Sequence, residues 1–248
     1  MRIEEIERMA RLEDTYWWFR TRRRLVRWLL ERFHVPEGGL VLDAGCGTGG
    51  TYAALRDRWQ VVGCDLVPLA IDHCRRRGMQ LGVVGDITAL PVRSQVFDAV
   101  VTCDVFEHLD KAEPAAEALF DATKPGGIIV VTVPALPWLW SEHDEALDHR
   151  RRYTRQGLQA LLSGAGWRVE LLNYAVSLLL PPIVAFRTWR RLVKRSAEKR
   201  VDVFELPRAI DALLGAISWL DAWLAVRVPL PPGASLVAVG RRMEGGSV

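Results

Sequence analysis

The sequence predicts an α/β fold, a doubly wound and mainly parallel sheet covered by helices. Two observations support this fold class. Unbroken runs of valine, isoleucine and leucine alternate with segments of about 10 to 15 residues that have helical periodicity. The first of these runs also leads straight into a glycine-rich turn, which is typical of sheets that bind a ligand at the carboxyl ends of their strands.

The first segment is helical, and the strand candidates follow it. A helical pattern runs from Ile3 to about Phe33, with an interruption near Thr15. The strand candidates after it are GLVLDAG, WQVVGCD, MQLGVVGD, VFDAVVTCD and GGIIVVTVP. Helical stretches such as PLAIDHCRRRG and AEPAAEALFDATKPGG separate them. Apolar strands divided by helices indicate a sheet that is buried on both faces.

The pattern changes after Pro134. The stretch ALPWLWSEHDEALDHRRRYT is polar, aromatic and rich in histidine, and its pattern is too irregular for a core element. A helix from Thr154 to about Ala165 and the strand WRVELLNYA follow. A long insertion then contains an apolar piece, the basic stretch RTWRRLVKRSAEKR and an apolar helix near Arg208 to Val226. The last strand candidate is SLVAVGRR.

These segments define the predicted organisation of the chain. We expect an N-terminal helical lid, a Rossmann-like domain, a helical cap inserted before the last strand, and the final strand with a tail. Their predicted bounds are residues 1–36, 37–175, 176–233 and 234–248. The length of 248 residues fits one domain with such appended helices.

Composition and charge narrow the class of protein. The chain is 50% hydrophobic and 25% charged, as folded proteins are, and its net charge of +3 does not by itself argue for nucleic acid. Its four cysteines lack metal-like spacing, so we expect reduced, buried thiols. Acids stand where a signal peptide needs an apolar core, and no apolar run is long enough to span a bilayer. We therefore expect a cytoplasmic protein.

The glycine-rich turn, VLDAGCGTGG, indicates which ligand the sheet binds. Gly45, Gly47 and Gly50 satisfy the spacing G-x-G-x-x-G, which by itself suggests a dinucleotide. Asp43 stands two residues before the first glycine, where it would repel an anionic pyrophosphate. The same carboxylate suits a ligand that carries an ammonium and a sulfonium group. Asp43 therefore favours S-adenosylmethionine over a nicotinamide cofactor.

Two further aspartates end the next two strand candidates. Asp65, in VVGCD, can accept hydrogen bonds from the ribose hydroxyls of an adenosine. Asp86, in VVGDI, can reach the adenine amino group, with Ile87 against the ring. A single aspartate after a strand is more often a helix cap or a turn residue. Three in succession at strand ends favour a ligand-binding crevice.

Several stretches resemble the class I S-adenosylmethionine-dependent methyltransferases, in particular the type 11 and type 12 small-molecule branch. They are VLDAGCGTG, GCDLVPLAI, GDITALPVRSQVFDAVVTCDVFEHL, KPGGIIVVTVP and SLVAVGRR. The resemblance implies a seven-stranded sheet with an antiparallel last strand, and S-adenosylmethionine as the cofactor. The cofactor contacts that it and the residues above imply are Asp43, Gly45, Cys46, Gly47, Thr48, Gly49, Asp65, Leu66, Asp86, Ile87, Cys103 and Asp104.

The stretch CDVFEHL offers groups that could act on a methyl acceptor. If a helix begins here, Asp104, Glu107 and His108 share one face. His108 is then a candidate catalytic residue, and the three together are an alternative metal site, since ubiquinone-pathway O-methyltransferases have a similar stretch. The competing interpretation is a helix start whose acids favour the dipole, with His108 packing locally. We predict no metal here.

The stretch WSEHDEALDHRRRYT offers a second set of candidates. His143 and His149 follow the fifth strand candidate, so they should lie over the same crevice, and His149 is our choice as the proton acceptor. The alternative is a solvated turn before a helix capped by Thr154. A subset of the resembling branch carries a similar H-x-R-R-Y-T stretch and a stretch like DTYWWFRTRR. The predicted acceptor contacts are Tyr16, Trp17, Arg151, Arg152 and Tyr153, the arginines for an anionic group.

The remaining aromatic and basic segments have two interpretations each. On a helix, Trp17, Arg20 and Arg24 face together, which fits either packing on the domain or a lid that excludes water; nucleic-acid binding is disfavoured. The insertion fits either a cap that roofs the acceptor site or, through Trp189 and other tryptophans beside arginines, peripheral contact with a membrane.

Together these features predict a methyltransferase that acts on a small or lipid-like acceptor, with oxygen as the favoured atom. No nucleic acid is expected as a partner. The alternatives are a scaffold that binds S-adenosylmethionine without turnover, and an N- or C-methyltransferase on a membrane- or glycan-linked acceptor. The sequence leaves the acceptor itself open.

Overall fold

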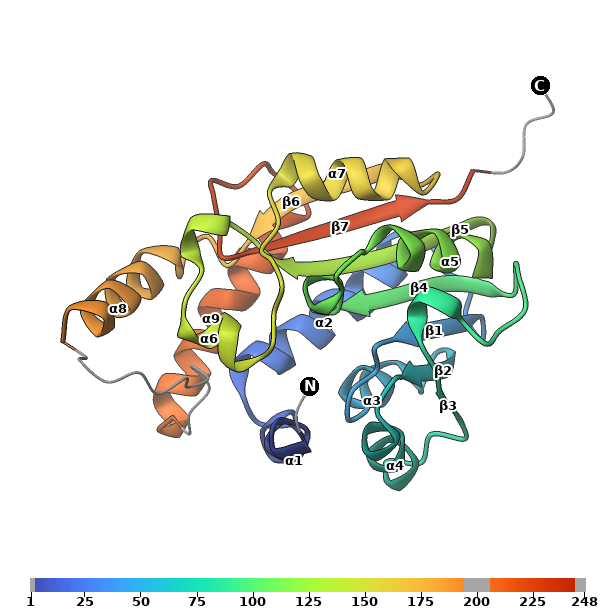
Figure 1. The fold of residues 1–248 in the computed structure, drawn as a ribbon, viewed down its shortest axis with the longest axis horizontal. Coiled ribbons are helices and arrows are strands. Elements are labelled where there is room, and N and C mark those ends of the chain that lie inside the picture. The colour runs from blue at the N-terminus through green and yellow to red at the C-terminus, as the bar shows by residue number, and fades with distance from the viewer. Residues whose placement is uncertain (1–2, 194–205, 244–248) are drawn as a thin grey trace.

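The computed structural model describes residues 3–193 and 206–243, and within them the chain forms a seven-stranded sheet with helices on both faces (Figure 1). The strand order is β3-β2-β1-β4-β5-β7-β6. Strands β1 to β5 pair in parallel, whereas β7 runs antiparallel to both β5 and β6. The predicted fold class is confirmed. The strands are β1 Leu40–Ala44, β2 Gln60–Asp65, β3 Leu81–Val84, β4 Phe97–Cys103, β5 Thr123–Pro134, β6 Arg168–Ala175 and β7 Ser235–Arg241.

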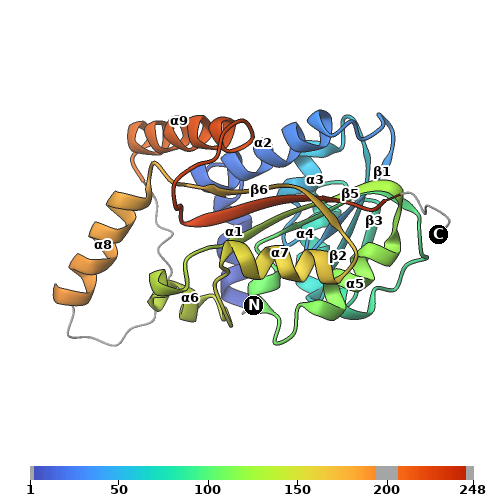
Figure 2. The ribbon, with the colours of Figure 1, turned by 90° about the horizontal axis from the view of Figure 1, so that it is seen from above.

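The helices form a layer on each face of the sheet, and α8 projects to one side (Figure 2). Helices α2, α3 and α9 bury apolar side chains on one face, and α5 and α7 do so on the other. The α-helices are α1 Ile3–Leu12, α2 Trp17–Arg32, α3 Gly50–Leu55, α4 Pro68–Arg76, α5 Glu113–Ala122, α6 Glu142–Ala146, α7 Arg155–Gly164, α8 Leu180–Val193 and α9 Arg208–Ala225; short 3-10 turns are η1 Ile87–Ala89, η2 Phe106–His108 and η3 Pro137–Leu139.

The central strands are buried on both sides, as their apolar sequences predict. Residues 128–131 of β5 are almost inaccessible, whereas Leu81 on the edge strand β3 is 50% exposed. Helix α7 begins as predicted, because the Thr154 side chain accepts a hydrogen bond from the Gly157 amide at 3.0 Å. All four cysteines are buried and unpaired, as expected. Among the described helices, none has the length and hydropathy needed to cross a bilayer.

The N-terminal segment divides into two helices at the predicted interruption. Helix α2 packs Val26 and Leu29 onto the sheet, and its outer side faces α9. Asp211 of α9 accepts hydrogen bonds from the Trp17 amide at 2.7 Å and from Arg20 at 2.6 Å. The first helix, α1, lies instead over the glycine turn, where a Cβ at Gly47 would lie 2.6 Å from Cε of Met9.

The insertion before β7 contains α8 and α9, as the sequence predicts, while residues 194–200 of its basic stretch lie outside the described residues. The segment after Pro134 is more ordered than predicted. It contains the short helix α6, which starts with a capping box made by Ser141 and Asp144. Asp144 is fully buried, so this segment is part of the interior and its predicted irregularity was wrong.

Candidate active site at the carboxyl ends of the strands

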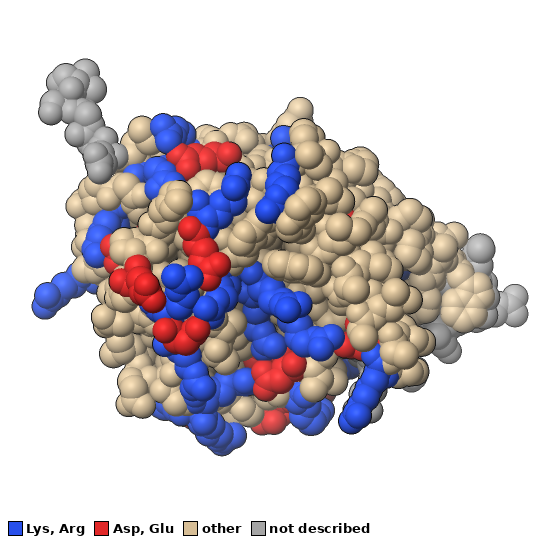
Figure 3. All heavy atoms as spheres, turned by 180° about the vertical axis from the view of Figure 1, so that it is seen from behind, with Lys and Arg blue, Asp and Glu red and all other residues tan. Residues whose placement is uncertain are grey.

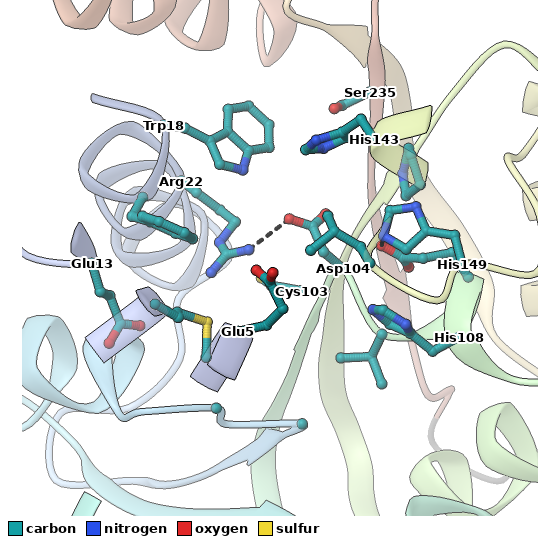
Figure 4. Close-up of a pocket in the computed structure, with 18 of the residues that line it drawn as sticks. Glu5, Glu13, Trp18, Arg22, Cys103, Asp104, His108, His143, His149 and Ser235 are labelled. Atoms are coloured by element: carbon teal, nitrogen blue, oxygen red, sulfur yellow. Dashed lines mark hydrogen bonds and ion pairs between the residues drawn. The ribbon is translucent and has the colours of Figure 1, made fainter. Parts of the chain in front are cut away.

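A cavity of about 600 Å³ lies at the carboxyl ends of the central strands. Its wall comes from the glycine turn, α1, α2, the loop after β4, the segment around α6, and the start of α8. Figure 4 shows Glu13, Trp18 and Arg22 on one side, the three histidines on the other, and Cys103 and Asp104 between them. Parallel strands end at the same edge of the sheet, which is why segments distant in sequence meet here.

The glycine turn forms the floor on the donor side, so named because of its predicted ligand. Gly45 and Gly47 have positive φ angles of 77° and 53°, a backbone conformation that residues other than glycine rarely adopt. A Cβ at Gly45 would lie 2.4 Å from Cγ2 of Val105, so only glycine fits there. The Gly45 amide is held by the Cys64 carbonyl at 2.7 Å. The turn therefore presents bare main chain to the cavity.

Asp43 lies at the end of β1 and is 2% exposed. Its Oδ2 has no hydrogen-bond partner, and burial raises the pKa of this carboxyl to about 7, although the charge of Arg22 acts in the opposite direction. A buried carboxylate without a partner is costly unless a cation approaches it. The position of Asp43 in the cavity wall matches its predicted role beside a cationic ligand.

The other two strand-end aspartates also line the cavity but are tied to the main chain. Asp65 accepts hydrogen bonds from the Gly47 and Val67 amides, both at 2.9 Å. Asp86 accepts from the amide and hydroxyl of Thr88 at 2.8 Å and caps η1, which was the alternative interpretation of a lone aspartate. Each carboxylate oxygen can accept a further bond. The predicted cofactor contacts that line the cavity are Asp43, Gly45, Cys46, Gly47, Asp65, Leu66, Asp86, Ile87, Cys103 and Asp104.

Glu13, which the sequence analysis did not identify, closes the glycine turn from above. It is 3% exposed, and it accepts hydrogen bonds from the Thr48 hydroxyl and from the Gly50 amide, the latter at 3.0 Å. Thr48 and Gly49 do not line the cavity, and their cofactor contact stays a prediction. An acid at the N-terminus of α3 also suits the dipole of that helix.

Arg22 and Asp104 form a partly buried ion pair in the cavity wall at 2.6 Å (Figure 4). Burial lowers the pKa of the Arg22 guanidinium, but the charge of Asp104 outweighs this effect and the pKa is raised. The second carboxylate oxygen of Asp104 accepts from the Thr132 hydroxyl at 3.1 Å. Burial also raises the pKa of Cys103 to about 12, so this thiol is not a nucleophile. Arg22 lies in the stretch DTYWWFRTRR that the sequence analysis quoted, but nothing in that stretch indicated Asp104 as its partner.

The three predicted histidines do meet on one wall. The ring centroids of His108 and His149 lie 4.8 Å apart, and those of His143 and His149 lie 6.4 Å apart. Burial lowers the pKa of His108 to about 4 and that of His143 to about 3, so both are neutral at pH 7. The interpretation of this stretch as a solvated turn is wrong, because the His149 side chain is only 6% exposed.

Asp144 holds His149 in place. Its carboxylate lies 3.1 Å from Nδ1 of His149 and accepts from Nε of Arg152 at 2.7 Å. Burial opposes the charge on Asp144, but hydrogen bonds and nearby cations outweigh it and keep the pKa of this carboxyl below its usual range. Arg152 also donates to the Ala135 carbonyl at 2.6 Å. The guanidinium of Arg152 lines the cavity, but its hydrogen bonds go to Asp144 and Ala135 within the protein.

The remaining predicted acceptor contacts divide between the wall and the interior. Tyr16 and Trp17 line the cavity. Arg151 donates instead to the Asp110 carbonyl and the Tyr153 hydroxyl donates to the Phe106 carbonyl at 3.1 Å, so neither is part of the wall. The main chain at Tyr153 forms a bridge with Ala135, the residue after β5.

The loop after β4 differs from the prediction. Asp104 has a φ of 56°, so no α-helix begins there, and only the 3-10 turn η2 follows. The expected common face of Asp104, Glu107 and His108 does not form, because Asp104 turns to Arg22. Glu107 is fully buried, and neither of its oxygens has a hydrogen-bond partner. It lies 4.0 Å from Nε2 of His149.

Comparison with known proteins places this site in a family. Residues 42–131 match the family described as Methyltransferase domain, and they span the glycine turn and the strand-end aspartates. Residues 42–131 are therefore a methyltransferase domain of the class I, S-adenosylmethionine-dependent type. S-adenosylmethionine is accordingly its cofactor, and the unpartnered Asp43 and the bare main chain of the turn fit a ligand with a cationic methionyl end.

Relatives of the methyltransferase domain act on different acceptors, judged by their names. A tRNA (carboxymethyluridine(34)-5-O)-methyltransferase of Arabidopsis thaliana is 34% identical over 46% of this chain and 27% of its own length. A malonyl-[acyl-carrier protein] O-methyltransferase of Enterobacter lignolyticus is 31% identical over 62% of this chain and 64% of its own. The chain thus spans less than two thirds of either relative. The tRNA enzymes lend no support to the expectation that nucleic acid is excluded.

Solved structures agree with the fold. A chain from the complex between the Haloferax volcanii Trm112 methyltransferase activator and a methyltransferase superposes with a TM-score of 0.65. The match covers 99% of this chain and 97% of the other at 20% identity, so it bears on the fold alone.

Proposed function

We propose that this methyltransferase transfers the methyl group of S-adenosylmethionine to an oxygen atom of a small or lipid-like acceptor. The observation that carries the proposal is the buried His149–Asp144 pair, which faces the donor side across the cavity. Methyl transfer needs alignment of donor and acceptor and, for a hydroxyl, a group that takes the proton. The two walls of the cavity supply these separately.

On the donor side, we assign Asp43 to the ammonium of the methionyl group. Its free Oδ2 is the acceptor that such a group needs, and a charge-assisted hydrogen bond would compensate its burial. Asp65 then meets the ribose hydroxyls, and Asp86 meets the adenine, with Ile87 against the ring. This order follows the strands β1, β2 and β3 outward along the sheet.

On the acceptor side, His149 lies next to the reacting oxygen. Asp144 accepts from Nδ1, which leaves Nε2 on the side of Glu107, within the cavity wall. The acceptor oxygen attacks the methyl carbon in line, the carbon–sulfur bond breaks, and the imidazole takes the hydroxyl proton. Aromatic side chains of α2, among them Trp17 and Trp18, line the same cavity and exclude water from it.

The nature of the acceptor follows from the roof. Leu179 before α8, Ile183 and Phe186 of α8, and Leu214 of α9 line the cavity with apolar surface. Trp189 and Leu213 on the same helices are more than half exposed, and the uncharged surface over α9 contrasts with the charged half of the rear face (Figure 3). An apolar acceptor, including one delivered from a membrane surface, suits such a roof.

The proposal is tested in two steps. Calorimetry with S-adenosylmethionine and its demethylated product should show micromolar or tighter binding, and no binding would overturn the assignment of the donor side. Labelled donor is then incubated with lipid, metabolite and tRNA fractions of the host. Label in a lipid or metabolite fraction supports the proposal. Label in tRNA would mean that the acceptor is a nucleic acid and not a small or lipid-like molecule. Donor binding without any transfer would favour a scaffold that binds S-adenosylmethionine without turnover.

A further inference from the structure

Glu107, His108 and His149 form a compact cluster on the acceptor wall. One potential ligand atom from each lies within 4.8 Å of the others. His108 and His149 are adjacent there, with His143 beyond them (Figure 4). Two imidazoles and a carboxylate are the ligands of many catalytic zinc sites, which keep a further position open for water or substrate.

The environment of Glu107 gives independent support for a cation at this cluster. The residue is 0% exposed, and both of its carboxylate oxygens lack a hydrogen-bond partner. A buried carboxyl group without hydrogen-bond partners is destabilising, because it has lost its hydration and gained no bond in return. The neighbouring Asp104 cannot serve instead, because its two oxygens are engaged by Arg22 and Thr132. A cation between Glu107 and the histidines would satisfy the carboxylate.

Both histidines are also oriented as metal ligands are. His149 bonds to the Asp144 carboxylate through Nδ1, and a ring nitrogen of His108 donates to the Asp148 carbonyl. Metal-binding histidines almost always donate their second N–H to a carboxylate or a carbonyl, because this fixes the tautomer and the ring orientation. Arg152 in turn donates to Asp144, so two successive side chains fix the position of the His149 ring.

We propose that Glu107, His108 and His149 bind one divalent cation of the Zn²⁺ type, with an open coordination position toward the cavity. Ligand atoms at about 2.0–2.2 Å from zinc lie roughly 3–3.5 Å apart, so binding draws the cluster together by about 1 Å. The inference rests on the proposed function and changes one role in it: Nε2 of His149 binds the cation and is no longer the proton acceptor, and the acceptor hydroxyl coordinates the cation and releases its proton to solvent. The oxygen–methyl bond then forms as the carbon–sulfur bond breaks.

The test measures metal binding to the full chain without any acceptor. Protein freed of metal with a chelator is titrated with Zn²⁺ by calorimetry and with Co²⁺ by visible spectroscopy. We expect one ion per chain and a Co²⁺ absorption spectrum of four- or five-coordinate geometry. Glu107→Gln and His149→Gln should each weaken binding by about 100-fold. His34→Asn is the matched control, because His34 is exposed and outside the cavity, and it should change nothing.

The outcomes separate this inference from the proposed function. Zn²⁺ binding that persists in both cluster variants, or that is absent from the wild type, would overturn the metal site. Calorimetry with S-adenosylmethionine on the same samples shows whether the donor side is intact. Donor binding and methyl transfer that are indifferent to chelator leave His149 as the proton acceptor and remove only the metal. Circular dichroism of each metal-free variant confirms that loss of binding is not loss of the fold.

Discussion

The two sides of the cavity are built by different means. The donor side combines the bare main chain of a glycine turn with three aspartates near the carboxyl ends of neighbouring strands. The acceptor side is made by side chains, with Asp144 holding His149 and Arg152 at its centre. A surface made of main chain tolerates changes in most side chains, whereas a buried ionic network depends on every member. The acceptor side should therefore be the more fragile of the two.

The largest expected effect comes from His149→Ala. Loss of the group next to the reacting oxygen should lower kcat by about 10²–10⁴-fold, the usual contribution of a proton-transferring residue. The dissociation constant of S-adenosylmethionine should stay within about twofold, because Asp43 and the glycine turn are on the other wall. Turnover with the identified acceptor and calorimetry with the donor measure the two quantities. Wild-type kcat in this variant would contradict the assignment.

Arg152→Met tests the network rather than the chemistry. Removing one partner of a buried ion pair typically costs about 3–5 kcal/mol, because Asp144 would keep its charge without its guanidinium partner. We expect the free energy of unfolding to fall by this amount in urea denaturation. Arg150→Met is a suitable control, since that arginine is largely exposed and its change should cost less than about 0.5 kcal/mol. Equal losses of unfolding free energy in the two variants would show that the buried network contributes no more to stability than an exposed ion pair.

Asp43→Asn should give an intermediate effect on the donor side. Loss of a charge-assisted hydrogen bond should weaken donor binding by about 1.5–3 kcal/mol, or about 10- to 150-fold. The pKa of Asp43 is raised to about 7 in the free protein, so its carboxylate forms as the pH rises. Wild-type affinity for the donor should therefore increase about tenfold from pH 6 to pH 8. A flat pH profile, or the same slope in the asparagine variant, would argue against this pairing.

The smallest effect is expected for Asp86→Ala. The residue caps η1 and lies at the outer end of the donor side, and the proposed function assigns it one hydrogen bond to adenine. We expect donor affinity to fall by about 1 kcal/mol, or about fivefold, with unchanged kcat at saturating donor. An effect as large as that of Asp43→Asn would mean that adenine recognition, and not the methionyl end, dominates binding.

The same contrast explains what the sequence could predict. The fold, the glycine turn, Asp65 and Asp86 were predictable because each depends on a strand and the few residues that follow it. Glu13 and Arg22 were not, because their partners Thr48 and Asp104 lie 35 and 82 residues away. Residue type and spacing along the chain carry no signal for such distant pairs.

The acceptor wall was only partly predicted for the same reason. The sequence indicated His108, His143 and His149 as candidates, and the structure brings them together. It did not indicate that Asp144 would orient His149 or that Glu107 would join His108 and His149. The expected helix after β4 also failed, because Asp104 adopts a left-handed conformation that residue type alone does not reveal.

Helix α2 connects the roof of the cavity to the loop after β4. Arg20 and Arg22 are two residues apart, yet one binds Asp211 in the roof and the other binds Asp104 beneath it. Because α2 is tied to both α9 and the loop after β4, a tilt of this helix would displace both segments together. An acceptor that displaces the roof would therefore also move the loop after β4. Release of the demethylated cofactor would in the same way move the roof.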